Sequence, residues 1–299
     1  MKTIQNPKKM NEKIKNKFIQ DNLYHSNVGQ YKTCPIKKSI KWIYKNYEHD
    51  EIEQICNVNI SQTHSIDIAL SLKEKCAIMY PLGKDFNGMN YETREGIFDE
   101  NIILRTNYSF VVKKQTELFN TKNDNNINVI FSDPVTIFRD IEYNPINLNN
   151  VGSVAVISLL YKKSQDLISD NDEEMLSSKD FLLLQMNIES VFQLAIVNNI
   201  KTLILPIMCG DFEVPIDDQL IIFNMCIMKY GDKIENIIIS IPHYDDDKCF
   251  QLFNYVSTEI IRPQIICDEL EMEKTVNNLS TILENKKLKQ NNSKQQTRH

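Results

Sequence analysis

The sequence predicts an α/β fold in which a mostly parallel sheet lies between two layers of helices. Its first support is a set of nearly continuous apolar runs, which suit strands that are covered on both faces. These runs occupy 76–80, 128–132, 153–160, 202–208 and 234–241. The second support is that segments with helical apolar spacing separate the runs, and strands alternating with helices are typical of a three-layer α/β/α architecture. Hydrophobic residues make up 42% of the 299 residues, enough for a sizeable core.

Helices are expected where apolar residues recur three and four positions apart. The segments with this pattern are 36–56, 64–75, 98–108, 178–198, 216–228 and 248–260. In the first of them the apolar positions are Ile40, Ile43, Tyr44 and Tyr47, and Ser65 is a candidate N-cap for the second. The sequence therefore predicts helices before, between and after the strands.

The polarity of the chain divides it into three parts. Residues 1–35 are polar and predict a weakly structured arm, and residues 36–267 carry the α/β domain with a helical N-terminal extension. From residue 268 to 299 the apolar positions thin out, which predicts one amphipathic helix followed by a disordered tail.

Composition excludes several classes of protein. The net charge of −6 argues against a general nucleic-acid binder, because neutralising phosphates needs a basic face. The seven cysteines are scattered without a CxxC pair, which predicts reduced thiols and neither a disulfide framework nor a metal site. Residues 1–17 lack the apolar core of a secretory signal, and no apolar stretch approaches the ~20 residues of a membrane span. We therefore expect an intracellular protein, cytoplasmic or nuclear, with no cofactor and no membrane partner.

Residue usage also points to the source of the chain. Asn, Ile and Lys are frequent and Gly is scarce, at seven residues. This usage suggests an AT-rich coding genome, such as that of a protist or a large DNA virus.

Gly-containing turns follow two of the predicted strands. One is Pro81-Leu82-Gly83-Lys84-Asp85-Phe86-Asn87-Gly88, and the other is Met208-Cys209-Gly210-Asp211-Phe212. Each comes after an apolar run and before a helical pattern, which is where an open α/β sheet holds a phosphate-bearing ligand. The sequence thus predicts two turns that meet over one binding site.

The segments 98–106, 130–139 and 208–212 follow one another in this order along the chain. Together they resemble the signature of the microbial-type poly(ADP-ribose) glycohydrolases, which are macrodomain proteins with a helical N-terminal extension. The best match is 130–139, with the residues Ile-Phe-Ser-Asp-Pro-Val-Thr-Ile-Phe-Arg. Before it, 98–106 matches the family's glutamate helix, with Arg105 at the family's arginine. After it, 208–212 matches the family's last Gly-rich loop. The resemblance covers roughly 35–260 and implies a macrodomain-like fold.

The resemblance also implies the catalytic residues, but this chain departs from the family there. Anchored on Arg105, the family's two consecutive glutamates fall on Glu100 and Asn101, so the catalytic second glutamate becomes an amide. One inserted residue would instead make Asp99 and Glu100 the acidic pair. The plain structural alternative is that these carboxylates simply favour the first turn of a helix, where the dipole stabilises negative charge.

The implied ligand contacts lie in the two Gly-containing turns. They are Gly83, Lys84, Phe86, Gly88, Gly210, Asp211 and Phe212. Backbone N–H groups there would hold a diphosphate, Lys84 could pair with a phosphate, and Phe212 could pack on a ribose. The first turn has lost two of the family's three glycines. The side chains of Leu82 and Lys84 therefore reduce the space in which a diphosphate would approach the backbone of this turn.

Two functions follow from the resemblance. The first is a poly(ADP-ribose) glycohydrolase that binds ADP-ribose units and hydrolyses the ribose–ribose bond. In that chemistry one carboxyl protonates the departing oxygen and then activates water. The second is a catalytically inactive macrodomain, a pseudoenzyme that acts as an ADP-ribose or poly(ADP-ribose) reader or as an interaction module.

Overall fold

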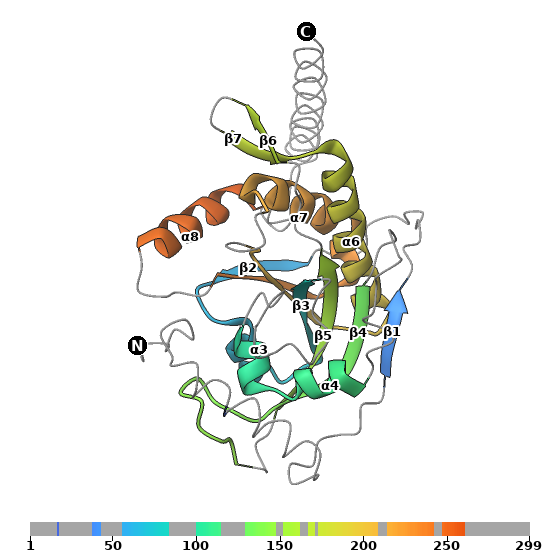
Figure 1. Ribbon diagram of the computed structural model, residues 1–299, viewed down its shortest axis with the longest axis vertical. Coiled ribbons are helices and arrows are strands. Elements are labelled where there is room, and N and C mark those ends of the chain that lie inside the picture. Colours follow the sequence, from blue (N-terminus) through green and yellow to red (C-terminus); the bar gives the residue numbers. More distant parts are fainter. Residues whose placement is uncertain are drawn as a thin grey trace.

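The computed structural model describes residues 17, 38–42, 56–83, 100–114, 129–147, 152–161, 167–170, 173–208, 214–241 and 247–260. Within these residues the main element is a seven-stranded sheet with the strand order β1-β4-β5-β3-β8-β9-β2 (Figure 1). Helices pack on both of its faces. The α/β fold class with a mostly parallel sheet that the sequence predicts is therefore confirmed.

The strands of the sheet run mostly in one direction. They are β1 (Lys38–Trp42), β2 (Asn57–Ser61), β3 (Cys76–Gly83), β4 (Val129–Ile137), β5 (Gly152–Tyr161), β8 (Thr202–Pro206) and β9 (Asn236–Ser240). β5, β3, β8, β9 and β2 are mutually parallel, whereas β4 is antiparallel to both β5 and β1. A separate hairpin joins β6 (Leu167–Asp170) to β7 (Glu173–Leu176).

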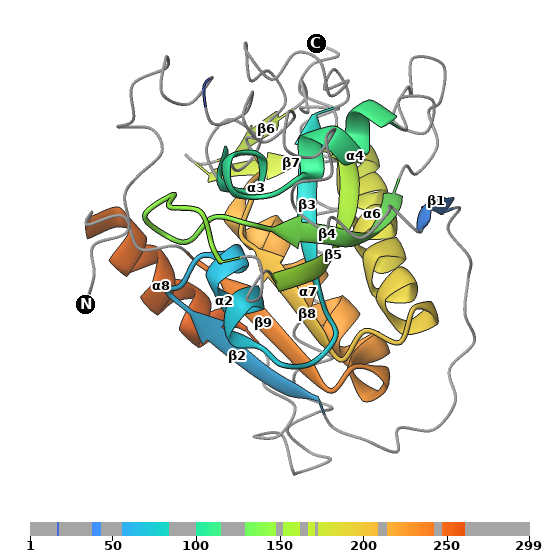
Figure 2. The same cartoon turned by 90° about the horizontal axis from the view of Figure 1, so that it is seen from below.

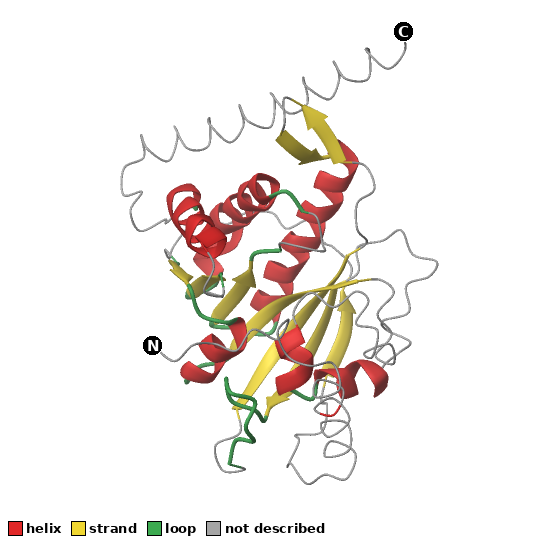
Figure 3. Cartoon of the chain, turned by 60° about the vertical axis from the view of Figure 1, so that its left-hand side comes forward, coloured by secondary structure: helices red, strands yellow, loops and turns green. Residues whose placement is uncertain are grey.

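The helices form one layer on each side of the sheet. On one face lie α6 (Ser178–Val197), α7 (Ile216–Tyr230) and α8 (Asp247–Glu259), and on the other lie α2 (Ser65–Ser71), α3 (Glu100–Arg105) and α4 (Tyr108–Lys114) (Figures 1 and 2). A short 3₁₀ turn, η5 (Gly231–Lys233), ends α7. Figure 3 shows the strands lying between these two sets of helices.

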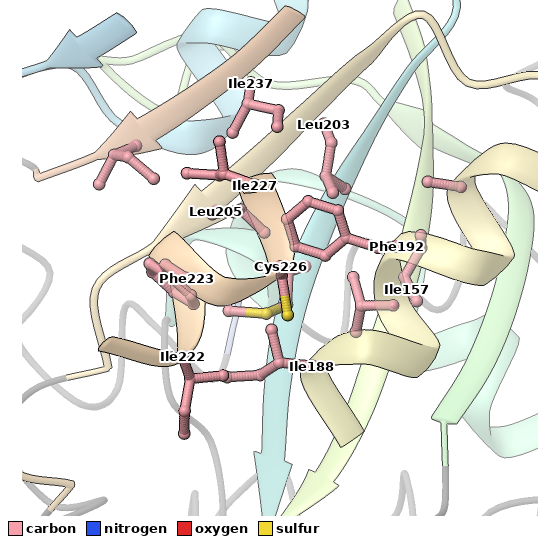
Figure 4. Close-up of a cluster of buried hydrophobic side chains, with 14 of the residues drawn as sticks. Ile157, Ile188, Phe192, Leu203, Leu205, Ile222, Phe223, Cys226, Ile227 and Ile237 are labelled. Carbon is pink, nitrogen blue, oxygen red and sulfur yellow. The ribbon is translucent and has the colours of Figure 1, made fainter. Parts of the chain in front are cut away.

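Successive side chains along each strand point to opposite faces of the sheet, so each layer of helices packs on a core of its own. In β3, Ala77 and Met79 belong to the core under α6 and α7, whereas Ile78 and Tyr80 belong to the core under α2, α3 and α4. Figure 4 shows the first core, where Phe192 of α6 and Cys226 of α7 meet strand residues such as Leu203. Both faces of each central strand are buried, which explains their continuous apolar sequences.

α6 is the described helix that is long and apolar enough to cross a membrane by length and composition. Over half of it is buried against the sheet and α7, and core helices commonly pass the same test. Ser177 caps it by accepting the N–H of Asp180 at 3.2 Å. The burial therefore accounts for its apolar character.

Several predicted elements differ in the structure. The helix predicted for 36–56 is wrong for 38–42, which form the edge strand β1. Ser65 is not the N-cap of α2: His64 holds that position without a capping side-chain bond, and Ser65 is buried in the first turn. The helix predicted for 98–108 begins at Glu100 and breaks after Arg105. The 1–35 arm, apart from Lys17, and the C-terminal helix and tail lie outside the described residues.

Candidate functional site

The two segments predicted as Gly-containing turns follow neighbouring strands of the sheet. β3 and β8 pair directly in parallel, with Ile78 opposite Ile204, so their carboxyl ends reach the same edge of the sheet. β9 and β2 end at this edge as well, with Ser240 opposite Ser61. Open α/β sheets bind ligands outside the carboxyl ends of their strands. The fold thus gives both turns a common starting edge.

The structure describes only part of the predicted site. The first turn is predicted to open at Pro81, but this is wrong for 81–83, which are the last three residues of β3, and Leu82 is buried in the core. Glu100 and Asn101 open α3. The remaining predicted residues, namely Lys84, Phe86, Gly88, Asp99, Gly210, Asp211 and Phe212, lie outside the described residues. Their contacts with a ligand stay predictions.

Asn101 is held on both sides by polar side chains from other elements. It is 2% exposed, and its Nδ2 lies 2.8 Å from Nε2 of His64. The hydroxyl of Tyr143 donates to its Oδ1 at 2.7 Å. With the amide in this orientation, the imidazole Nε2 accepts the amide N–H. Since His64 follows β2 at the carboxyl edge, Asn101 also lies beside that edge.

Arg105 anchors the other end of α3. It lies four residues after Asn101, so both side chains share one face of the helix. The buried guanidinium makes two bonds to Asp67 of α2, at 2.6 and 3.0 Å. Its Nε also donates to the carbonyl of Arg139 at 3.3 Å. α3 is therefore fixed against the first turn of α2 by an amide at its start and a bidentate ion pair at its end.

A tight turn after β4 supplies Tyr143. Oδ1 of Asp140 accepts the N–H groups of Glu142 and Asn144, each at 2.9 Å. Tyr143 has a φ of 63°, in the left-handed region. Its carbonyl accepts a hydrogen bond from Nη1 of Arg139 at 3.0 Å. These contacts form a continuous chain of six residues, in the order Asp67, Arg105, Arg139, Tyr143, Asn101 and His64. The backbone N–H of Asp67 donates to the carbonyl of His64 at 2.9 Å and so closes the chain into a ring.

This ring of contacts is the part of the site that sequence reasoning missed. Its members come from α2, α3 and the turn after β4, and no local spacing connects them. The available signals were Asp140 and Asn144, which favour an Asx turn, with Pro145 directly after them. They indicate the turn but not its contact with Asn101.

The chemistry open to the described residues at this edge is limited. The amide of Asn101 does not titrate usefully and can neither donate nor accept a proton as an acid or base does. Glu100, at the first position of α3, is half-buried and its Oε2 is buried, so at most its Oε1 could meet a ligand at the edge. Among the described residues no group of three or more His, Cys, Asp or Glu side chains could hold a metal ion.

A second buried polar cluster lies away from this edge, between α6 and α7. The carboxylate of Glu189, 4% exposed, accepts bonds from Gln185 at 3.0 Å, Lys229 at 2.9 Å and Tyr230 at 3.0 Å. Burial tends to raise the pKa of Glu189, but these three donors outweigh it and the pKa is lowered. Burial alone would lower the pKa of Lys229, but its bond to Glu189 raises it instead. This cluster joins the two helices.

Comparisons with known proteins identify the fold. No family model matches the sequence, and no curated protein matches it. Among solved structures, poly(ADP-ribose) glycohydrolase from Thermomonospora curvata matches with a TM-score of 0.61 and 9% identity, over 80% of this chain and 99% of that one. The protein from the same organism bound to the inhibitor ADP-HPD gives 0.59 and 10%, over 80% and 98%. That from Deinococcus radiodurans in complex with ADP-ribose gives 0.55 and 14%, over 70% and 86%. The chain therefore has the fold of the bacterial poly(ADP-ribose) glycohydrolases, as the resemblance of its sequence predicted.

Proposed function

We propose that this protein binds ADP-ribose at the carboxyl edge of its sheet and acts as a reader that does not cleave the ribose–ribose bond. The ligand class is supported by the fold, which a D. radiodurans structure shares while holding ADP-ribose. It is also supported by the common edge from which the turns after β3 and β8 begin. A single observation carries the inactive character: a buried amide, Asn101, stands where the resemblance puts the catalytic carboxyl.

The surroundings of Asn101 support this proposal. Glycosidic hydrolysis needs one group that gives a proton to the departing oxygen and later takes one from water. The Asn101 amide has no such proton, and its two polar atoms contact His64 and Tyr143. A ligand at the edge would therefore meet neither an acid nor a base at this position.

Hydrolysis by Glu100 is the second candidate. It requires the alternative register, in which Asp99 and Glu100 are the acidic pair. One observation favours it: Glu100 opens α3 directly beside Asn101 and is partly exposed. Its carboxyl group could then act as acid and base in turn, provided that it reaches the ribose.

Titration calorimetry with ADP-ribose at high protein concentration tests the binding. We expect saturable binding to the wild-type chain, and a complete lack of heat from specific binding would end both ADP-ribose functions. ADP and ribose 5-phosphate, titrated separately, show which half of the ligand supplies the affinity.

Release of ADP-ribose from poly(ADP-ribose) then separates the two candidates. We expect the wild-type chain and Glu100→Gln to release no more than a buffer blank. Release by the wild type that Glu100→Gln abolishes would establish the hydrolase instead. Glu235→Gln is the matched control, because Glu235 is an exposed carboxylate that pairs with Lys201 at the opposite edge of the sheet.

A further inference from the structure

Three buried side chains fill the space at the start of α3. Asn101 is 2% exposed, His64 is 1% exposed and Tyr143 is 3% exposed. Nδ2 of Asn101 lies 2.8 Å from Nε2 of His64, and its Oδ1 accepts a hydrogen bond from the hydroxyl of Tyr143 at 2.7 Å. Both polar atoms of the amide therefore contact the protein itself, and almost none of the side chain is accessible to a ligand.

His64 is attached to a backbone that is fixed on both sides. Its carbonyl accepts the N–H groups of Asp67 and Ile68, at 2.9 and 3.0 Å, in the first turn of α2. The carbonyl of Thr63, directly before it, accepts the hydroxyl of Ser240 in β9 at 2.8 Å. The imidazole is therefore tied both to α2 and to the sheet.

Tyr143 is held by a separate part of the chain. Its carbonyl accepts a hydrogen bond from Arg139, and the turn built on Asp140 fixes the backbone on either side of it. To reach the amide of Asn101, a ligand would have to displace one of two side chains that are anchored independently.

A sugar beside residue 101 would need the positions that these side chains occupy. The resemblance puts the catalytic carboxyl at this residue, and an acid reaches the oxygen that it protonates only at about 2.6–3.2 Å. The ribose that carries this oxygen would therefore lie in contact with the side chain of residue 101. In this chain, His64 and Tyr143 lie at that distance from the Asn101 amide instead.

We propose that His64 and Tyr143 exclude the terminal ribose of ADP-ribose from the position beside residue 101, so that the protein recognises the ADP half of its ligand. This inference rests on the proposed function and narrows it. The ligand class is esters of adenosine diphosphate, in which the group on the second phosphate stays in solvent and adds no affinity. Such a reader binds ADP-ribose without enclosing the bond that a hydrolase has to cleave.

The first test compares ADP-ribose with the β-methyl ester of ADP by titration calorimetry on the wild-type chain. The methyl ester carries the same charge as ADP-ribose but lacks the terminal ribose, so the difference in affinity isolates the contribution of that sugar. We expect the two dissociation constants to agree within three-fold. A larger preference for ADP-ribose would overturn the inference and leave the proposed function intact, whereas binding of neither ligand would overturn both.

His64→Ala tests whether the imidazole excludes the sugar. Its removal opens the position beside Nδ2 of Asn101, so we expect the preference for ADP-ribose over the methyl ester to rise at least five-fold. Gln193→Ala is the matched control, because Gln193 is also buried, 1% exposed, and its Nε2 donates to the hydroxyl of Tyr230 on the other face of the sheet. The preference in this control should stay at the wild-type value.

Thermal midpoints show whether each variant is folded. An unchanged preference in folded His64→Ala would overturn the role of His64. If His64→Ala does not fold, the comparison of the two ligands on the wild-type chain decides the inference by itself.

Discussion

At the scale of single residues, Tyr143 combines an unfavourable backbone with a specific contact. A φ of 63° is uncommon for a residue with a bulky side chain and costs on the order of 1–2 kcal/mol. The Asp140 turn holds the backbone there, and the buried side chain then reaches Asn101. The structure retains this conformation because the same turn also fixes Arg139.

Removing the Tyr143 hydroxyl tests the value of that contact. We expect Tyr143→Phe to lower the free energy of unfolding by about 1–2 kcal/mol, because a buried donor to Asn101 is lost while the ring still packs. Urea unfolding at pH 7 measures the change.

An exposed tyrosine provides the comparison. Tyr255 is 40% exposed and its hydroxyl donates to Asp217, so Tyr255→Phe should change the same free energy by less than about 0.5 kcal/mol. Equal effects of the two substitutions would mean that the Tyr143 contact with Asn101 contributes nothing.

The sequence identified part of this residue-scale arrangement. It predicted a helix over 98–108 that includes Glu100, Asn101 and Arg105, and the structure has all three in the shorter α3. It did not pair Asn101 with His64 or Tyr143, since these contacts join residues far apart in the chain and depend on tertiary packing. A single sequence does not indicate such tertiary contacts, because each of these residues is also common in a local helix or turn.

At the scale of elements, the pairing of α6 with α7 depends on a buried carboxylate. The apolar faces of both helices pack on the sheet, and Glu189 adds bonds to Lys229 and Tyr230 across the helix–helix contact. Burial and the negative charge of Glu189 raise the pKa of Tyr230 to about 12 although Gln193 and Lys229 act to lower it, so its hydroxyl is a donor at neutral pH. Polar contacts therefore fix the register of two otherwise apolar helices.

The lowered pKa of Glu189 predicts how stability changes with pH. The folded chain holds this proton less tightly than the unfolded chain does, so the contribution is fully present above the ordinary value of 4.5. It is lost as pH falls through the folded pKa. We expect Glu189→Gln to cost about 1–3 kcal/mol at pH 7, and the difference from wild type to shrink below pH 4.5.

Urea unfolding at several pH values between 3 and 7 measures this difference. Glu235→Gln is again the control, because its exposed ion pair with Lys201 should contribute less than about 1 kcal/mol at any pH. A Glu189→Gln deficit that stays constant across this range would contradict the assignment.

The elements that the sequence predicted well are those with a strong local apolar pattern. α6, α7 and α8, and strands β5, β8 and β9, carry apolar patterns that local reasoning detects. The spacing of Ile40, Ile43 and Tyr44 predicts a helix where β1 lies, although Ile40 and Trp42 also alternate with polar residues as in a strand. The break between α3 and α4 depends on Thr106, whose hydroxyl accepts the N–H of Tyr108 at 3.1 Å. In such short segments the local sequence favours two structures almost equally, and tertiary packing decides between them.

At the scale of the whole molecule, three buried cysteines lie in the two cores on opposite faces of the sheet. Cys56 and Cys226 belong to the core under α6 and α7, and Cys76 belongs to the opposite one. Burial raises the pKa of Cys56 and of Cys76 to about 11, and it raises the pKa of Cys226 as well. Because the thiolate is the reactive form, these thiols should be inert in the native fold.

Thiol alkylation at pH 8, mapped by mass spectrometry, tests this expectation. We expect modification of Cys56, Cys76 and Cys226 to follow the global unfolding transition in urea, and all three to react together. The fully denatured chain provides the reference rate. Rapid modification of Cys226 in native buffer would show that the helical layer opens without unfolding of the whole domain.

The direct pairing of β3 with β8 has a consequence for the order of assembly. The strands are neighbours in the sheet, yet β4, β5, the β6–β7 hairpin and α6 all lie between them along the chain. Closing so long an interval is slow, since chain entropy opposes it until the later contacts form. We therefore expect this edge to be completed late in folding, because a nascent chain that has not yet produced β8 lacks the strand that lies beside β3.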